Sequence, residues 1–333
     1  MRKLANHLSR EQAMKEIAAE SFSRQTISFY RYILLDNVEE LRDQLFEEWH
    51  KLGVLGRVYL SSEGINAQIN VPVPNLETFR ASIDTSPYFK DVPFKLAIEE
   101  PATSFWKLMI KVRKQIVADN LPAGTYDITN VGTHLNAEEF NREIENGAIV
   151  VDMRNKYESD IGKFSNAVTT DTQRFGDELH EVVEKLQDKK GEKVLLYCTG
   201  GIRCEKASAF LKHKGFEDVS QLYGGIINYK HEIEEKKLES KFIGKNYVFD
   251  GRMAEAVTAD VIGKCFTCKS PADSYDNCAN DLCHALFIQC ASCKEKMFGA
   301  CSEECAKIAA LPIEEKKVLR KGKKATFKVL SST

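Results

Sequence analysis

The chain has 333 residues, 43% hydrophobic and 29% charged, which suggests two or three domains and is typical of a soluble globular protein rather than a disordered one. Lys and Arg total 47 and Asp and Glu total 49, a net charge of −2, so any nucleic-acid site must be a local patch. Because no apolar run approaches the roughly 18 residues of a membrane span and the N-terminus lacks a secretory pattern, we expect a cytoplasmic protein without membrane contact.

The first 120 residues predict a helix within residues 1–25 and a small α+β domain over residues 26–120. The expected elements are a strand at 26–35, a helix after an N-cap at Asp36, strands at 53–60 and 65–71, a short helix at 76–83 and a strand at 94–98. This βαββαβ order is that of a ferredoxin-like or acylphosphatase-like fold.

A further strand is expected over residues 105–117, with apolar residues at its even positions. Lys107, Lys111 and Arg113 occupy odd positions and therefore share one face. They either protect a solvated edge strand or contact an RNA backbone.

Residues 131–240 alternate strands and helices after a turn-rich linker at 121–132. We expect helices at 137–147, 177–187 and 206–215 and buried strands at 148–154 and 193–198. Buried strands separated by helices indicate a parallel sheet with helices on both faces.

The loop after the strand at 193–198 carries the residues expected to be catalytic, Cys198 and Arg203. The intervening loop residues are Thr199, Gly200, Gly201 and Ile202. Paired glycines let the backbone curl around the sulfur, and the amides of the loop and of the following helix favour a thiolate. Arg203 adds a fixed positive charge. We expect an ionised and accessible sulfur; the alternative is a buried structural cysteine.

Two further features of this loop bear on its chemistry. Four residues separate Cys198 from Arg203, whereas cysteine phosphatases use five to cradle a tetrahedral phosphate, so the tighter loop suits a sulfur atom or another small group. Cys204, expected as the second residue of the helix, either faces the core or acts as a redox partner of Cys198.

Three segments carry a resemblance to a known family. The loop CTGGIR resembles the active loop of rhodaneses. The longer string CTGGIRCEKASAFL, together with SSEGINAQI and CANDLCHALFIQCASC, resembles the rhodanese-containing bacterial tRNA uridine-34 hydroxylases. This resemblance implies oxygen-dependent conversion of the wobble uridine to 5-hydroxyuridine, with molecular oxygen as co-substrate, an unassigned electron donor, and the family's catalytic cysteine at Cys198.

The same resemblance implies the tRNA anticodon arm, and not DNA, as the partner. Two other functions stay open. A persulfide sulfurtransferase acting on a small thiol acceptor, or in tRNA thiolation, needs the same loop. A non-catalytic RNA-binding scaffold would not need an intact Cys198 and Arg203. The sequence does not indicate an oligomeric state.

Residues 241–333 hold the remaining eight cysteines and predict a metal-binding domain. The candidate ligands are Cys265, Cys268, Cys278, Cys283, Cys290, Cys293, Cys301 and Cys305. Eight thiolates satisfy two tetrahedral Zn²⁺ ions, and one ion or substitution of a ligand by His284 is also compatible with the spacing. We expect structural zinc; an iron–sulfur cluster is the alternative. Spacing alone does not assign cysteines to ions.

The C-terminal residues are basic, because no acidic residue follows Glu315. Lys321, Lys323 and Lys324 lie in this run. It is either a solvated tail or an electrostatic contact with RNA phosphates.

Overall fold

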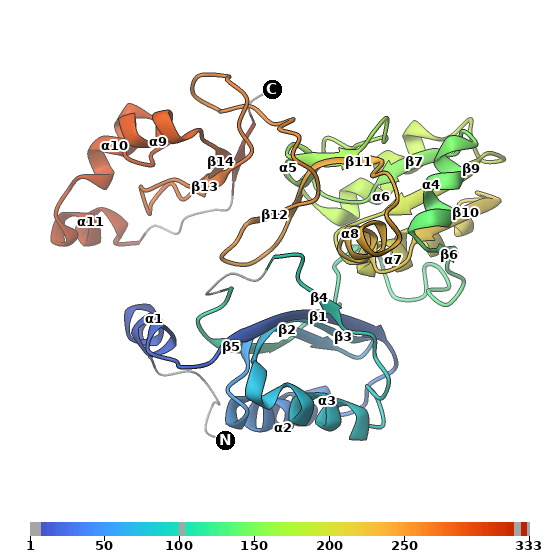
Figure 1. The fold of residues 1–333 in the computed structure, drawn as a ribbon, viewed down its shortest axis with the longest axis horizontal. Coiled ribbons are helices and arrows are strands. Elements are labelled where there is room, and N and C mark those ends of the chain that lie inside the picture. The colour runs from blue at the N-terminus through green and yellow to red at the C-terminus, as the bar shows by residue number, and fades with distance from the viewer. Residues whose placement is uncertain (1–7, 100–103, 323–327, 332–333) are drawn as a thin grey trace. The chain divides into compact units, whose positions relative to one another are not determined.

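The computed structural model describes residues 8–99, 104–322 and 328–331 (Figure 1). Its chain forms two compact units. The first comprises residues 1–155, 167–239 and 249–252, and the second comprises residues 156–166, 240–248 and 253–333. Among the described helices, none combines the length and apolar character needed to cross a membrane. The domain boundaries predicted from the sequence, at residues 1–25, 26–120, 131–240 and 241–333, stay predictions.

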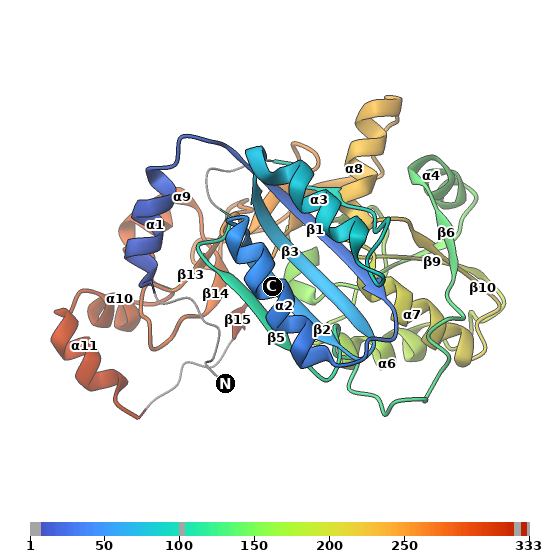
Figure 2. The same ribbon diagram turned by 90° about the horizontal axis from the view of Figure 1, so that it is seen from below.

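The first part of unit 1 is a sheet covered on one face by two helices. Its elements are α1 (Arg10–Ala18), β1 (Arg24–Tyr32), α2 (Val38–Lys51), β2 (Leu55–Ser61), β3 (Gly64–Pro72), the 3₁₀ turn η1 (Val73–Asn75), α3 (Leu76–Thr85), β4 (Lys95–Leu96) and β5 (Leu108–Val112). The strand order is β4-β1-β3-β2-β5, and α2 and α3 lie side by side on one face (Figures 1 and 2). Fully buried Trp49 and Phe79 join helices to sheet, which confirms the acylphosphatase-like prediction.

The helix expected within residues 1–25 is present as α1, which begins after a capping box at Ser9 and spans nine residues. Two other local expectations are wrong. Asp36 is not the N-cap of α2, because Asn37 occupies that position in a left-handed conformation, with φ of 48°. The strand expected over 105–117 is reduced to β5, which pairs in parallel with residues 56–60 of β2 and ends where that partner ends.

The second part of unit 1 is the predicted parallel sheet. Its elements are β6 (Thr133–Leu135), α4 (Ala137–Glu145), β7 (Ile149–Asp152), α6 (Phe175–Lys185), β9 (Lys193–Tyr197), α7 (Ile202–His213), β10 (Asp218–Leu222) and α8 (Gly225–Lys236). The order is β6-β10-β9-β7, with every pairing parallel. Val194 and Leu196 face the core formed with α6 and α7, so the intervening Leu195 points to the opposite face.

Unit 2 contains two small sheets and short helices. Its elements are α5 (Lys156–Ser159), β8 (Gly162–Phe164), β11 (Phe242–Tyr247), β12 (Ala254–Ala256), β13 (Tyr275–Asn277), β14 (Leu286–Ile288), α9 (Ala291–Lys296), α10 (Glu303–Ala309), α11 (Ile313–Arg320) and β15 (Val329–Leu330). The sheets are β12-β11-β8 and β13-β14-β15. Two elements, α11 and β15, lie within the basic C-terminal segment, and β15 pairs with β14. The solvated-tail and RNA-contact interpretations of this segment stay predictions.

Candidate active site

Cys198 lies directly after β9, at the carboxyl edge of the parallel sheet. Its Sγ accepts a hydrogen bond of 3.1 Å from the Gly201 amide. Gly201 has a φ of 94°, a conformation that glycine adopts without a steric penalty, and α7 begins at the next residue. The loop amide thus points at the sulfur, as the sequence predicts.

The carbonyl groups of the loop are held away from the sulfur by the start of α8. The Ile226 amide donates to the Cys198 carbonyl at 3.0 Å, and the Ile227 amide donates to the Thr199 carbonyl at 3.2 Å. Gly225 permits this contact, because a Cβ there would lie 2.5 Å from the Cys198 carbonyl oxygen. The Gly-Gly pair before α8 is visible in the sequence, but its role in holding this loop was not predicted.

The environment of Cys198 favours its thiolate. Burial opposes ionisation, but a hydrogen bond from the Cys204 thiol, the positive charge of Arg203 and backbone amides of Arg203 and Cys204 outweigh it. The pKa of the Cys198 thiol falls to about 6. Burial and the neighbouring Cys198 charge raise the pKa of Cys204 well above its ordinary value, so Cys204 stays a protonated donor.

Cys204 faces the core, which is one of the two alternatives expected for it, and it is the third residue of α7 rather than the second. It is fully buried in the same apolar core as Cys198, and its thiol donates a hydrogen bond to the Cys198 sulfur. A redox role of Cys204 stays a proposal.

Arg203 is 8% exposed and lies on the first turn of α7. Its Nη2 donates to Thr199 Oγ1 at 3.3 Å, and its guanidinium carbon lies 5.9 Å from the centre of the Phe249 ring. These contacts hold the charge beside the loop.

The expectation that the sulfur is accessible is wrong for this conformation. Cys198 is 0% exposed, whereas Thr199 and Gly200 are half-buried. A Cβ built on Gly200 would meet no atom within 4 Å. The loop is therefore open at Gly200, although the sulfur itself is covered.

At Gly201 the loop is covered by the sheet of the acylphosphatase-like part. The Tyr30 hydroxyl donates to Glu205 Oε1 at 2.8 Å, and His134 Nε2 lies 3.0 Å from the same oxygen. The Glu205 carboxylate raises the pKa of His134. A Cβ on Gly201 would lie 2.9 Å from the Tyr30 hydroxyl. None of Tyr30, His134 and Glu205 was predicted from the sequence, because no local motif marks them.

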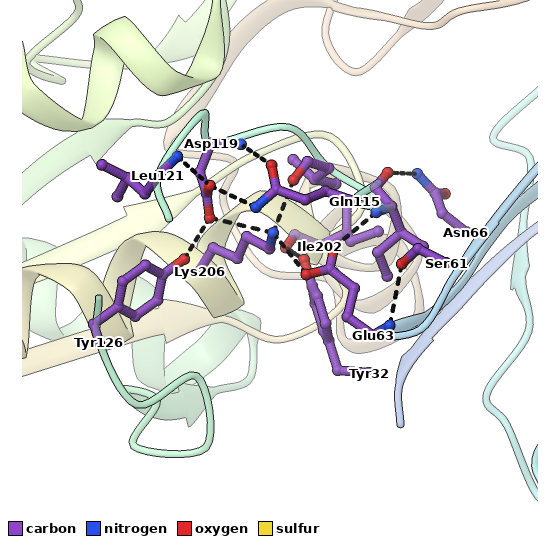
Figure 3. Close-up of polar contacts among 12 residues, drawn as sticks. Tyr32, Ser61, Glu63, Asn66, Gln115, Asp119, Leu121, Tyr126, Ile202 and Lys206 are labelled. Atoms are coloured by element: carbon purple, nitrogen blue, oxygen red, sulfur yellow. Dashed lines mark hydrogen bonds and ion pairs between the residues drawn. The ribbon is translucent and has the colours of Figure 1, made fainter. Parts of the chain in front are cut away.

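A buried ionic network joins α7 to the same part of the chain (Figure 3). Lys206 is 1% exposed; its Nζ lies 3.0 Å from Glu63 Oε2 and 3.2 Å from Asp119 Oδ2, and donates to the Val117 carbonyl at 2.9 Å. Asp119 also accepts hydrogen bonds from the Leu121 amide, the Gln115 side chain and the Tyr126 hydroxyl. The network fixes the helix that carries Arg203 and Cys204.

The strand end beside Cys198 is fixed by a second buried ion pair. Arg154 binds Asp152 through two hydrogen bonds, of 2.8 and 2.6 Å. The Tyr197 hydroxyl donates to the same carboxylate at 2.7 Å. The residue that precedes Cys198 is therefore held by its side chain as well as by the sheet.

The eight cysteines of unit 2 form two groups of four. One group contains Cys265, Cys268, Cys290 and Cys293, and the other contains Cys278, Cys283, Cys301 and Cys305. The first pair along the chain joins the third, and the second pair joins the fourth. His284 belongs to neither group.

The sulfur spacing of both groups fits a tetrahedral ion. Four sulfurs at about 2.3 Å from one ion lie about 3.8 Å apart. The Cys268–Cys290, Cys283–Cys301 and Cys301–Cys305 sulfur pairs are each 3.7 Å apart. Each group can therefore hold a metal ion.

Three of the residues predicted to contact RNA lie in or next to β5. Lys107 places its Nζ 4.3 Å above the Trp106 ring, next to β5, and Arg113 lies 5.6 Å from the centre of the Tyr59 ring. Lys111 is half-buried within β5. Lys321 is exposed after α11, and Lys323 and Lys324 fall outside the described residues.

Comparison with known proteins matches all three parts of the chain to described families. Residues 24–116 match "UPF0176 acylphosphatase like domain", residues 136–232 match "Rhodanese-like domain" and residues 243–306 match "Rhodanase C-terminal". A protein from Leptospira interrogans named tRNA uridine(34) hydroxylase is 54% identical over 97% of this chain and 88% of its own length. Proteins of the same name from Cronobacter sakazakii and Escherichia fergusonii are 44% and 43% identical over 99% of this chain and 95% of theirs. The chain therefore belongs to the family of bacterial proteins named tRNA uridine(34) hydroxylase.

Proposed function

We propose that this protein hydroxylates the wobble uridine of tRNA, forming 5-hydroxyuridine in the cytoplasm. The observation that carries the proposal is the 54% identity over 97% of the chain to a relative of that name. A thiolate-favouring loop within the matched rhodanese-like part supports it.

Cys198 is the proposed nucleophile. Its thiolate adds to C6 of the uracil, and the C5–C6 electron pair moves toward C5 and O4, which makes C5 nucleophilic. After C5 is oxidised, loss of its proton expels the thiolate and restores the double bond. Arg203 stabilises the thiolate before it adds to C6 and again after it is expelled. A Cys198 persulfide or oxidised sulfur acting on the base is the alternative form of this chemistry.

Molecular oxygen is the proposed oxidant. Insertion of one oxygen atom into the C5–H bond leaves the other as water, and this takes up two electrons and two protons from a reductant. The reductant is not assigned. Cys204 is a candidate redox partner, because its thiol donates a hydrogen bond to the Cys198 sulfur.

The anticodon arm is the proposed RNA partner, with the uridine unstacked to enter the loop. Tyr223 is a candidate stacking platform, since it is 46% exposed directly after β10 and packs edge-on to His134. Lys107, Lys111, Arg113 and Lys321 are candidate phosphate contacts, together with Lys323 and Lys324.

Each cysteine group is proposed to bind one structural Zn²⁺. Backbone amides support thiolates in both groups, since Cys290 N donates to Cys265 Sγ and Cys301 N donates to Cys278 Sγ, each at 3.4 Å. Two ions would cross-link segments that contain only short helices and strands.

Nucleoside mass spectrometry of tRNA tests the proposal. A strain that lacks this protein and any redundant pathway should regain 5-hydroxyuridine from the wild-type gene but not from Cys198→Ala. Full modification by Cys198→Ala would refute the assigned role. Supplying less oxygen should lower the yield in proportion.

A persulfide sulfurtransferase is the second candidate, favoured by the four-residue loop with an amide directed at the sulfur. It predicts turnover in a thiosulfate:cyanide assay that does not change when residues 107–113 lose their charges. Hydroxylation without such turnover would exclude it.

A further inference from the structure

Lys95 brings a second cation to the Cys198 loop from a different part of the chain. It lies on the edge strand β4, opposite Ser28 of β1. Its Nζ is 4.3 Å from the centre of the Tyr30 ring. The Tyr30 hydroxyl approaches Gly201, whose amide bonds to the Cys198 sulfur. A chain of contacts through Tyr30 and Gly201 therefore links this ammonium group to the sulfur.

The charge of Lys95 is incompletely compensated. Within the described part of the chain, no carboxylate lies within 4.0 Å of its Nζ, whereas buried Lys206 contacts two carboxylates. Burial lowers the pKa of the Lys95 amine to about 8, and the charges of Cys198 and Glu205 oppose this change. A cation–π contact with Tyr30 contributes only about 0.5–2 kcal/mol and leaves the positive charge in place.

We propose that Lys95 binds a negatively charged oxygen of the nucleotide that enters the Cys198 loop, so that the acylphosphatase-like part completes the active site. This inference rests on the proposed function. The oxygen belongs either to a phosphate beside the unstacked uridine or to O4, which gains negative charge when the thiolate adds to C6. Both are oxygen anions that an ammonium group beside the loop stabilises.

The test compares Lys95→Met, Lys95→Gln and Lys95→Arg in the full-length protein. Lys51→Met is the matched control, because Lys51 is exposed on α2, which covers the opposite face of the same sheet. Two quantities are measured with unmodified tRNA: the Kd over a range of salt, and the single-turnover hydroxylation rate at saturating tRNA. Thermal unfolding identifies any variant that does not fold.

Lys95→Met and Lys95→Gln should lower the ratio of the saturated single-turnover rate to Kd at least tenfold, and Lys95→Arg should restore most of it. If the oxygen is a phosphate, the Kd rises and the salt dependence of log K falls by about one phosphate contact. If the oxygen is O4, the Kd stays constant and the saturated rate falls.

Folded Lys95→Met and Lys95→Gln proteins that match Lys51→Met in both measurements would overturn the inference and leave Lys95 a packing residue of Tyr30. An inactive Lys95→Arg with a normal unfolding temperature would also overturn it, because the charge alone would then not suffice. Wild-type protein without hydroxylation would instead refute the proposed function, which separates the two failures.

Discussion

The thiol of Cys204 provides a direct test of how the protein ionises Cys198. Replacement by alanine removes a hydrogen-bond donor from the sulfur, whereas replacement by serine keeps one. With a Cys198 pKa of about 6, about nine tenths of the sulfur is thiolate at pH 7. Activity that depends on the thiolate is lost as the pH falls through 6.

The magnitude follows from the strength of the lost bond. A hydrogen bond to a charged group contributes about 1.5–3 kcal/mol, and one pKa unit corresponds to about 1.4 kcal/mol. Cys204→Ala should therefore raise the Cys198 pKa by about one to two units. The thiolate fraction at pH 7 then falls to between about one half and one tenth, which lowers the rate about two- to tenfold.

The assay is the single-turnover hydroxylation rate between pH 5 and pH 9. Cys204→Ala should recover wild-type activity at high pH, and Cys204→Ser should keep a profile close to that of the wild type. An unshifted acid limb in Cys204→Ala would refute this reasoning. Equal inactivity of both variants at every pH would show that Cys204 is a redox partner.

Three further predictions concern other parts of the molecule. Lys206→Met should destabilise unit 1 by about 3 kcal/mol in urea unfolding, because it leaves buried Asp119 without its cation. Lys212 lies on the same helix and donates a hydrogen bond to a carbonyl, so Lys212→Met should cost only about 1 kcal/mol. Equal losses of stability in the two variants would contradict the importance of the Lys206 network. Gly200→Val should leave the unfolding temperature unchanged, since its side chain enters open space, yet abolish hydroxylation; full activity would mean that the uridine enters elsewhere. Metal analysis should find two zinc ions per chain, and a chelator should expose eight additional thiols to a thiol reagent, whereas Cys290→Ser should lose one ion but not the other.

The features predicted well from sequence are those that neighbouring residues determine. The buried strand at 193–197, the glycine pair and the following helix bring the Gly201 amide to the Cys198 sulfur through residues close in sequence. The order of strands and helices in the acylphosphatase-like part follows from alternation and helical spacing. In these regions local preference and the final fold agree.

The contacts between distant segments could not be predicted in this way. Alternation along β3 distinguishes an apolar face from a polar one. It does not show whether the polar face contacts solvent or is covered by another element, and Asn70 on that face is in fact only 1% exposed. Tyr30 and Lys95 lie on the same covered face, and nothing in their sequence neighbourhood marks Glu205 or Cys198 as partners.

The grouping of the cysteines could not be predicted for the same reason, because it depends on contacts between distant segments. Each pair, such as Cys265 with Cys268, is close in sequence and was recognised. Which other pair completes its group depends on how β13 and β14 fold back, and spacing along the chain carries no information about that choice. The two groups are interleaved along the chain, because the second pair lies within the loop closed by the first group.

Burial of Cys198 gives the covering sheet a role in the reaction. A thiolate with a lowered pKa that stood open to solvent would react with any oxidant, and sulfur oxidation beyond the sulfenic state is not reversed by ordinary thiols. Here Tyr30 lies against Gly201 on one side of the loop, and the Lys206 network holds α7 to the same part of the chain. The loop is open at Gly200, and under the proposed function an unstacked base that enters there meets the sulfur and excludes solvent. The arrangement that buries Cys198 would then limit its chemistry to a nucleotide that enters the loop.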